Sequence, residues 1–194
     1  MSHYYDSDQN SKFFKEEITA LIREHDFTFV TGSGVFSVKK VDKGTLLLSD
    51  KCIIEDKWDV LDLGCGYGVI GIVVAKLFPK CKVTMLDVNK RAILLAKENS
   101  NDLDNVTVIR SDLFEKIKGD FNTILVNPPY VAGRNISFQI IEQSKKYLKK
   151  DGLLQIVFRH QKGGKVIMDK MKEVFGNVEV IAKKSGYRIY VSKN

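Results

Sequence analysis

Apolar and polar positions fall into a regular rhythm after Trp58, where short apolar runs alternate with longer amphipathic stretches. This rhythm predicts strands alternating with helices. The expected strands cover residues 59–66, 81–89, 106–114, 121–130 and 153–160, and the expected helices cover residues 68–79, 90–102, 137–152 and 164–176. Residues 178–192 predict two further strands joined by a turn at Ser185 and Gly186. Gly152 and Gly176 are expected to end the last two helices in a left-handed conformation.

Strands that alternate with helices imply right-handed crossovers and a sheet covered on both faces. The predicted fold is therefore α/β: a Rossmann-like, seven-stranded, mostly parallel sheet with a C-terminal antiparallel hairpin. In such sheets ligands bind beyond the carboxyl ends of the strands. Each motif described below follows one of those ends.

The segment before Trp58 is harder to interpret. Residues 1–12 are polar and predict a loose arm, and residues 13–50 fit two patterns. A helix would use Phe14, Ile18, Leu21 and Ile22, whereas a strand pair would use Ile18, Ala20, Ile22, Phe27 and Phe29. The β-rich stretch after Asp26 contains a glycine turn and favours strands there. Residues 41–50 predict a turn that enters a short helix or strand, so residues 1–54 are taken as an arm with a β-rich extension.

Composition narrows the functional classes. The chain of 194 residues has a formal charge of +7, and many of its basic residues lie in the C-terminal third. This positive charge is consistent with binding to a polyanion such as RNA, and it is equally consistent with a source organism whose proteins are generally rich in lysine. Cys52, Cys65 and Cys81 are widely spaced, so neither a disulfide framework nor a metal site is expected. The polar N-terminus and the absence of a long apolar run predict a cytoplasmic protein with no membrane segment.

Glycines cluster directly after the first strand of the regular region, at Gly64, Gly66 and Gly68. Glycine lets the backbone turn sharply and approach a ligand closely. The acidic residue Asp87 ends the next strand, where a carboxylate can accept both hydroxyls of a ribose. A dinucleotide site would have the pattern G-x-G-x-x-G, but this chain has G-x-G-x-G preceded by Asp62. A buried carboxylate there would repel a pyrophosphate and would suit an ammonium or sulfonium cation.

Four segments in this order, "VLDLGCGYGVIGI", "LDVNKRAI", "SDLF" and "NPPY", resemble the motifs of class I S-adenosylmethionine-dependent methyltransferases. The resemblance covers residues 58 to about 192 and assigns residues 55–194 to a methyltransferase domain. It implies S-adenosylmethionine as the cofactor. The implied cofactor-binding residues are Asp62, Gly64, Cys65, Gly66, Tyr67, Gly68, Asp87, Val88, Asp112, Leu113 and Asn127. Within this set Asp62 would lie near the ammonium group, Asp87 would bind the ribose, and Asp112 would face the adenine amino group.

The turn Asn127-Pro128-Pro129-Tyr130 ends an apolar strand abruptly. The lone pair of an amide or exocyclic base nitrogen is delocalised and becomes nucleophilic only as the nitrogen pyramidalises. The Asn127 side-chain carbonyl and the Pro128 main-chain carbonyl could both accept hydrogen bonds from such an NH2 group. Two prolines fix φ and hold these carbonyls rigidly, and Tyr130 offers a ring on which a planar acceptor can stack. An ordinary tight turn after a strand is the alternative interpretation.

The NPPY pattern occurs in enzymes that methylate adenine N6, guanine N2, cytosine N4 or protein glutamine. "GVFS" followed by "D-x-G-T" resembles the small-domain enzymes that methylate guanine N2 of ribosomal RNA, and that resemblance makes ribosomal RNA the expected partner. Two-domain relatives carry an N-terminal half that this chain lacks, which leaves the target nucleotide open. The alternatives are protein glutamine methylation, adenine-N6 methylation of nucleic acid, and a nucleotide- or RNA-binding module without catalysis. The sequence does not indicate an oligomeric state.

Several other residues are candidates for substrate contacts. Phe36 and Thr45, with Lys43 and Gly44 between them, could line the pocket or belong to an ordinary turn. Arg159, Lys162 and Lys165 could bind phosphates and His160 could stack on a base, or the loop could be simply solvated. Tyr67 could cover the cofactor, and Cys65 is expected to serve as a small residue rather than as a nucleophile.

Overall fold

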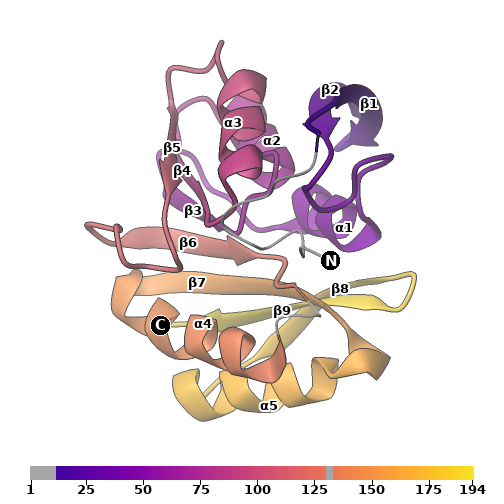
Figure 1. Ribbon diagram of the computed structural model, residues 1–194. Helices are drawn as coiled ribbons and strands as arrows, with labels where there is room; N and C mark the ends of the chain where they lie inside the picture. Colours follow the sequence, from indigo (N-terminus) through magenta and orange to yellow (C-terminus); the bar gives the residue numbers. More distant parts are fainter. Residues whose placement is uncertain (1–11, 130–132) are drawn as a thin grey trace.

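A seven-stranded sheet runs through the centre of the molecule in the computed structural model, which describes residues 12–129 and 133–194 (Figure 1). Its strands are β3 Asp59–Leu63, β4 Lys82–Asp87, β5 Val106–Arg110, β6 Phe121–Val126, β7 Leu148–Arg159, β8 Glu179–Lys184 and β9 Tyr187–Lys193. They lie in the order β5-β4-β3-β6-β7-β9-β8, and the first five are parallel to one another. Strand β9 is antiparallel to both β7 and β8. The predicted mostly parallel sheet with a C-terminal hairpin is confirmed.

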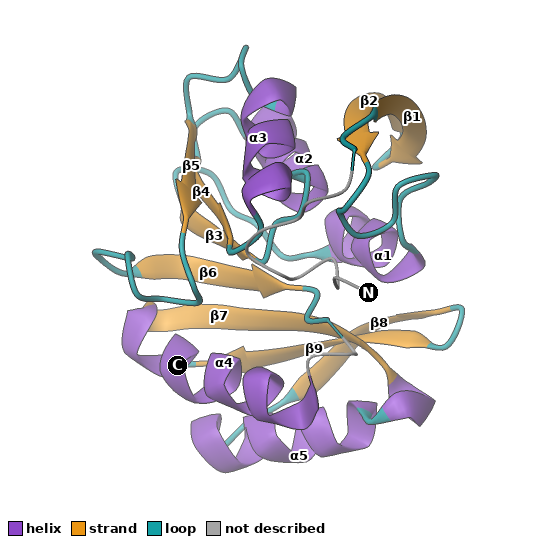
Figure 2. Cartoon of the chain, viewed as in Figure 1, coloured by secondary structure: helices purple, strands orange, loops and turns teal. Residues whose placement is uncertain are grey.

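Helices cover both faces of this sheet (Figure 2). They are α1 Lys43–Lys51, α2 Val69–Leu77, α3 Lys90–Asn99, α4 Gly133–Tyr147 and α5 Gly164–Phe175, and a short 3-10 turn, η2, spans His160–Lys162. Helices α1, α2 and α3 pack in one hydrophobic core, whereas α4 and α5 pack in a second core on the opposite face. Alternate strand residues such as Val60 and Leu61 supply the two cores, because successive side chains point to opposite faces.

The N-terminal segment forms a separate antiparallel pair, β1 Lys15–Ile22 and β2 His25–Gly32. Of the two patterns considered for this segment, the strand pair is therefore the one that forms. Its buried side chains include Ile22 and Phe29, which join the core of α1, α2 and α3. Asn99 at the end of α3 fixes β2 in place, since its side chain exchanges two hydrogen bonds with the Val30 backbone at 2.7 and 2.8 Å.

Helix α1 resolves the alternative left open for residues 41–50, since residues 43–51 are helical. Asp42 caps its N-terminus by accepting from the N–H groups of Gly44 and Thr45. Arg23, in the turn of the β1–β2 hairpin, donates to the carbonyl oxygens of Ser49 and Cys52 at the other end. Both ends of this short helix therefore have polar partners for backbone groups that no helical turn can satisfy.

Two of the three predicted glycine turns are confirmed, and one is wrong. Gly176 ends α5 with φ 77°, and Ser185 and Gly186 form the β8–β9 turn with φ 51° and 81°. Helix α4 ends at Tyr147, so Gly152 is not its cap but lies inside β7. A β-carbon at Gly152 would lie 2.9 Å from the Lys149 oxygen and 3.1 Å from the Phe121 oxygen. Close backbone approach between β6 and β7 therefore requires this glycine.

The predicted division at residues 54 and 55 does not separate two cores. Phe29 and Leu48 pack in the same hydrophobic cluster as Val73 and Ile189. The division remains a prediction about sequence organisation. No helix in residues 12–129 and 133–194 is long and apolar enough to span a membrane.

Candidate active site

A cavity of about 310 Å³ lies where β3, β4, β5 and β6 end. The carboxyl ends of parallel strands meet at one edge of a sheet, so segments far apart in the sequence converge there. Most of the predicted site residues line this cavity: Phe36, Thr45, Gly64, Cys65, Gly66, Tyr67, Asp87, Val88, Asp112, Leu113, Asn127, Pro128 and Pro129. Its volume falls in the range of small-molecule sites.

The glycine loop turns sharply from β3 into α2 because Gly64, Gly66 and Gly68 all have positive φ angles, of 75°, 57° and 97°. The N–H groups of Gly64 and Cys65 donate to the Leu86 oxygen at 2.9 Å, which ties the loop to β4. A β-carbon added at Gly64 or Gly66 would meet no atom within 4 Å, and both glycines line the cavity. A ligand can therefore lie directly against this backbone.

Three further residues of the loop, Gly68, Cys65 and Tyr67, contribute to its packing. Gly68 lies at the N-cap of α2, immediately before Val69, and does not line the cavity; a β-carbon there would lie 2.8 Å from Ile72 Cδ1. Burial raises the pKa of the Cys65 thiol well above its usual value, so it stays protonated, as expected for a small residue rather than a nucleophile. Tyr67 is buried in the wall, and its hydroxyl donates to the Ser37 oxygen at 3.4 Å.

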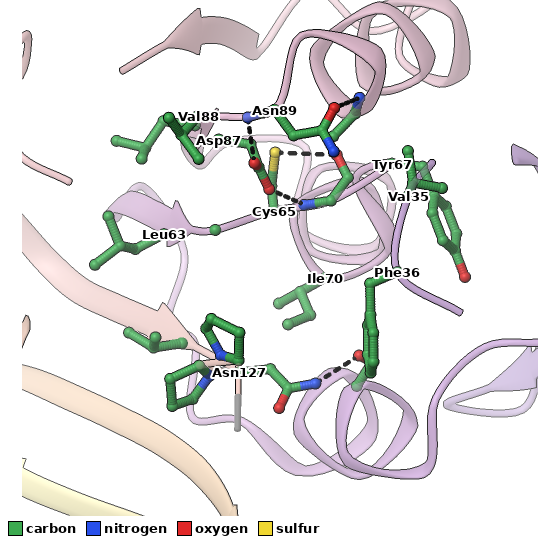
Figure 3. A pocket seen from close by; sticks show the side chains of 18 of the residues that line it. Val35, Phe36, Leu63, Cys65, Tyr67, Ile70, Asp87, Val88, Asn89 and Asn127 are labelled. Atoms are coloured by element: carbon green, nitrogen blue, oxygen red, sulfur yellow. Dashed lines mark hydrogen bonds between the residues drawn. The ribbon is translucent and has the colours of Figure 1, made fainter. Parts of the chain in front are cut away.

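Asp87 lines the cavity at the end nearest β4 (Figure 3). One carboxylate oxygen accepts from the Gly66 N–H at 2.9 Å, and the other accepts from the Asn89 N–H at 2.8 Å. Burial raises the pKa of Asp87, although these hydrogen bonds act in the opposite direction. Each carboxylate oxygen has more than one lone pair, so both can still accept a hydroxyl from a ligand.

Asp62 lies beneath the glycine loop rather than in the cavity wall. It is completely buried, and one of its oxygens accepts from the Gly71 N–H at 2.8 Å. The other oxygen, Oδ1, has no hydrogen-bond partner within the described part of the chain. Burial, with a further contribution from the charge of Asp87, raises the pKa of Asp62 to about 7. The predicted contact with an ammonium group therefore remains a prediction.

Asn127 lies at the opposite end of the cavity from Asp87, and Leu63 and Ile70 lie between them (Figure 3). Its Nδ2 donates to Thr45 Oγ1 at 2.9 Å and to Asp42 Oδ2 at 3.2 Å. An ionised carboxylate can only accept, so the amide nitrogen must be the atom that faces Asp42. The side-chain oxygen of Asn127 accepts no hydrogen bond from any described residue, and it is therefore the atom left for a ligand.

Asp42 has a role at this end that the sequence pattern did not indicate. Besides capping α1 and accepting from Asn127, it accepts from the Tyr187 hydroxyl at 3.3 Å through its second oxygen. Asp42 also lines the cavity. An aspartate immediately before an apolar helical run is an N-cap signal, which could have identified the cap but not its contacts with Asn127 or Tyr187.

Pro128 is buried and Pro129 half-buried, and both line the cavity beside Asn127. The predicted role of the Pro128 carbonyl as a second acceptor remains a prediction. Tyr130, the predicted stacking residue, lies outside the described residues. On the side walls Phe36 faces the cavity from the segment before α1, and Val88 lies next to Asp87 (Figure 3). Leu113 also lines the cavity and adds apolar surface.

Arg159, the last residue of β7, and His160 and Lys162, in η2 directly after it, do not line the cavity. The His160 Nδ1 atom forms a hydrogen bond with the buried Tyr190 hydroxyl at 2.8 Å, so this nitrogen is engaged inside the protein. Arg159 lies over the Tyr187 ring, 5.4 Å from its centroid. Lys162 and Lys165 are exposed.

Comparison with known proteins identifies the family. The family model of the methyltransferase small domain matches residues 26–191. The chain belongs to this family. It is 40% identical to the uncharacterized protein YbxB of Bacillus subtilis (strain 168) across 98% of both chains. It is 34% identical to ribosomal RNA small subunit methyltransferase C of Haemophilus influenzae (strain 86-028NP), across 87% of this chain and 52% of that relative.

Among solved structures, the chain resembles the Thermus thermophilus 16S rRNA N2 G1207 methyltransferase (RsmC), which was solved with AdoMet and guanosine. The TM-score is 0.78 at 22% identity, over 93% of this chain and 50% of that one, which shows a shared fold. This chain thus spans about half the length of the ribosomal RNA methyltransferases it matches and almost the whole length of YbxB. Family membership confirms the predicted class of enzyme, a methyltransferase that uses S-adenosylmethionine.

The residues of this methyltransferase cavity fit that cofactor. The bare backbone at Gly64 and Gly66 leaves room for its methionine part, and the Asp87 oxygens could accept the ribose hydroxyls. Val88 and Leu113 would pack against the adenine. Among residues 12–129 and 133–194, no basic side chain lines the wall to suit a pyrophosphate. These assignments are proposals built on the geometry above.

Proposed function

We propose that this methyltransferase modifies an exocyclic amine of a nucleobase in RNA, with guanine N2 of ribosomal RNA as the preferred acceptor. The Haemophilus relative is named for the small ribosomal subunit RNA, and the Thermus structure is described as a guanine N2 enzyme with guanosine bound. These names support the acceptor class. The +7 charge of the chain supports a polyanionic substrate.

The orientation of the Asn127 amide carries the proposal. Both contacts found for its nitrogen run to α1, through Thr45 and Asp42, which leaves the oxygen as the acceptor at the cavity. An exocyclic amine has two N–H donors and a delocalised lone pair. An acceptor oxygen held in a fixed position can bind one of those N–H groups and favour the positive charge that develops on the nitrogen.

When bound, S-adenosylmethionine supplies a methyl group on a positively charged sulfur. The chain supplies position: Asn127 would orient the acceptor amine, and Asp42 and Thr45 would hold Asn127. Pro128 would add a main-chain acceptor, and Tyr130 would stack on the base. Direct transfer of this kind requires no covalent bond between the protein and the base.

The decisive experiment is to incubate the protein with tritiated S-adenosylmethionine and either total RNA or total protein. We expect label in RNA, recovered as N2-methylguanosine after digestion to nucleosides. Label recovered as N6-methyladenosine would keep the RNA substrate and replace the base. Label in protein glutamine would refute the RNA proposal.

Protein glutamine methylation is the main alternative, because a glutamine side chain has the same planar NH2 group and would use Asn127 in the same way. A binding module without catalysis is the alternative from another class. Calorimetry with S-adenosylmethionine and with NAD addresses that alternative, since a methyltransferase binds the first. A cytoplasmic location, expected from the sequence, remains a prediction.

A further inference from the structure

Two basic segments meet at the cavity edge of the sheet. Residues 159–165 and 183–188 contain Arg159, Lys162, Lys165, Lys183, Lys184 and Arg188 and no aspartate or glutamate. We call these six residues the basic edge. They lie at the end of β7, in η2, in the first turn of α5, and on both sides of the β8–β9 turn. That turn lies on the same side of the molecule as α1 (Figure 1).

Strand pairing places these charges side by side. Arg159 pairs with Tyr187, and Tyr187 pairs with Lys184, so the three residues form a row across three strands. In the next row Arg188 lies directly opposite Lys183. Like charges directly opposite each other in a sheet are destabilising. Such an arrangement is expected where the charges serve a partner rather than the fold.

At the opposite edge of the sheet, where the parallel strands begin, lysines form ion pairs with aspartates. Lys149 pairs with Asp59 at 2.5 Å, and Lys193 pairs with Asp151 at 2.8 Å. Within residues 12–129 and 133–194, no ion pair is found for the lysines of the basic edge or for Arg188. The two edges thus differ: at the opposite edge these lysines pair with aspartates, whereas the four lysines and Arg188 of the basic edge have no ion pair in the described part of the chain.

The basic edge is held rigidly beside the cavity wall. The His160 N–H donates to the Gly186 oxygen at 3.0 Å, which joins η2 to the β8–β9 turn. Tyr187, under the Arg159 guanidinium, donates its hydroxyl to Asp42, and Asp42 lines the cavity. Tyr187 therefore links Arg159 of the basic edge to Asp42 of the cavity wall.

We propose that the basic edge binds the phosphates of the RNA strand whose base enters the cavity. This inference rests on the proposed function and extends it to the substrate's backbone. A base that enters a largely apolar cavity must leave its flanking phosphates outside, because each carries a negative charge. Lysine and arginine side chains at the rim would neutralise them and fix the strand relative to Asn127.

The test compares two double variants with the same change in charge. Lys183→Gln with Lys184→Gln removes two exposed charges from the basic edge. Lys82→Gln with Lys150→Gln removes two exposed charges from the opposite edge and is the matched control. Binding of a short fluorescent single-stranded RNA is measured over a series of salt concentrations. S-adenosylmethionine affinity and the kinetics of methyl transfer to RNA are measured in parallel.

For the basic-edge variant we expect the slope of log affinity against log salt to fall by about 1.4, from two phosphate contacts at about 0.7 each. We also expect a higher KM for RNA with kcat and cofactor affinity unchanged. The control variant should keep the wild-type slope. Equal changes in the two variants, or no change in either, would overturn the inference while leaving the proposed function intact.

Failure of the proposed function gives a different result, since wild-type protein would then transfer no label to RNA. A polyglutamate peptide distinguishes the remaining partner class. If this peptide competes with the RNA at equal charge, and loses affinity equally in the basic-edge variant, an acidic protein partner replaces RNA and the inference is wrong.

Discussion

The two ends of the cavity are built in different ways. At the Asp87 end, the carboxylate at the end of β4 accepts from the N–H groups of Gly66 and Asn89, which follow β3 and β4 and lie no more than 21 residues away. At the Asn127 end, the key side chain is fixed by Thr45 and Asp42, which are 82 and 85 residues away. The Asp87 end is therefore built from neighbouring strand–loop segments, whereas the Asn127 end depends on hydrogen bonds to a helix that is distant in the sequence.

This difference suggests a division of labour. The Asp87 end, with glycines that leave the backbone bare, suits tight binding of a cofactor. The Asn127 end, with a single acceptor oxygen held by a helix cap, suits orientation of a reacting amine. Substitutions at the two ends should therefore affect different measured quantities: cofactor affinity at the first and turnover at the second.

The largest effect is expected from Asn127→Ala, which removes the acceptor oxygen. We expect methyl transfer to fall by about 100-fold or more, by analogy with the loss of one transition-state hydrogen bond. Affinity for S-adenosylmethionine, measured by calorimetry, should change little. Asn135→Ala, an exposed residue of α4, is the control and should keep wild-type turnover. Normal turnover by the Asn127 variant would remove the assigned role.

Gly66→Ala tests the other end. The methyl group would enter the cavity, and a non-glycine residue at φ 57° is strained by roughly 1–2 kcal/mol. Gly119→Ala is matched to it, because Gly119 also has positive φ and open space but does not line the cavity. Both variants should lose similar stability in urea unfolding. Only Gly66→Ala should lose cofactor affinity, by about tenfold or more if overpacking costs about 1.4 kcal/mol or more.

Asp62→Asn tests the buried carboxylate beneath the glycine loop. Between pH 3.8 and about 7 the folded chain retains a proton at Asp62 that the unfolded chain releases. Raising the pH through this window should therefore lower the unfolding free energy, by at most about 1.4 kcal/mol per pH unit, with no further loss above it. The amide that replaces the carboxyl group in the variant does not titrate, so the pH slope of the variant should be smaller. Equal slopes in urea unfolding would contradict the raised pKa.

The smallest effect is expected from Thr45→Val, which removes one of the two acceptors that hold the Asn127 nitrogen. We expect kcat to fall by roughly 3- to 10-fold, the value of one hydrogen bond, with cofactor affinity unchanged. Thr45→Ser keeps the hydroxyl and should restore most of the rate. If serine does not rescue the rate, or if cofactor affinity falls instead, Thr45 does not act through Asn127.

Much of the site could be predicted because parallel strands deliver their following residues to one edge. Local patterns therefore indicated Gly64, Asp87 and Asn127 as members of one site, and the cavity contains all three. The orientation of the Asn127 amide could not be predicted, because it depends on a helix cap brought near by folding. Gly152 was misread for a similar reason: glycine after a helix suggests a cap, but here it permits close contact between β6 and β7.

By itself, the sequence determined the order of strands and helices after Trp58, the glycine loop and the family, because each depends on short-range patterns. Tertiary structure alone decided whether residues 13–32 form a helix or a hairpin, which Asn127 atom is left for a ligand, and that Lys183 and Lys184 lie at the cavity edge of the sheet, across strands from Arg188 and Arg159. These depend on contacts between distant segments, and such contacts exist only once the backbone has folded.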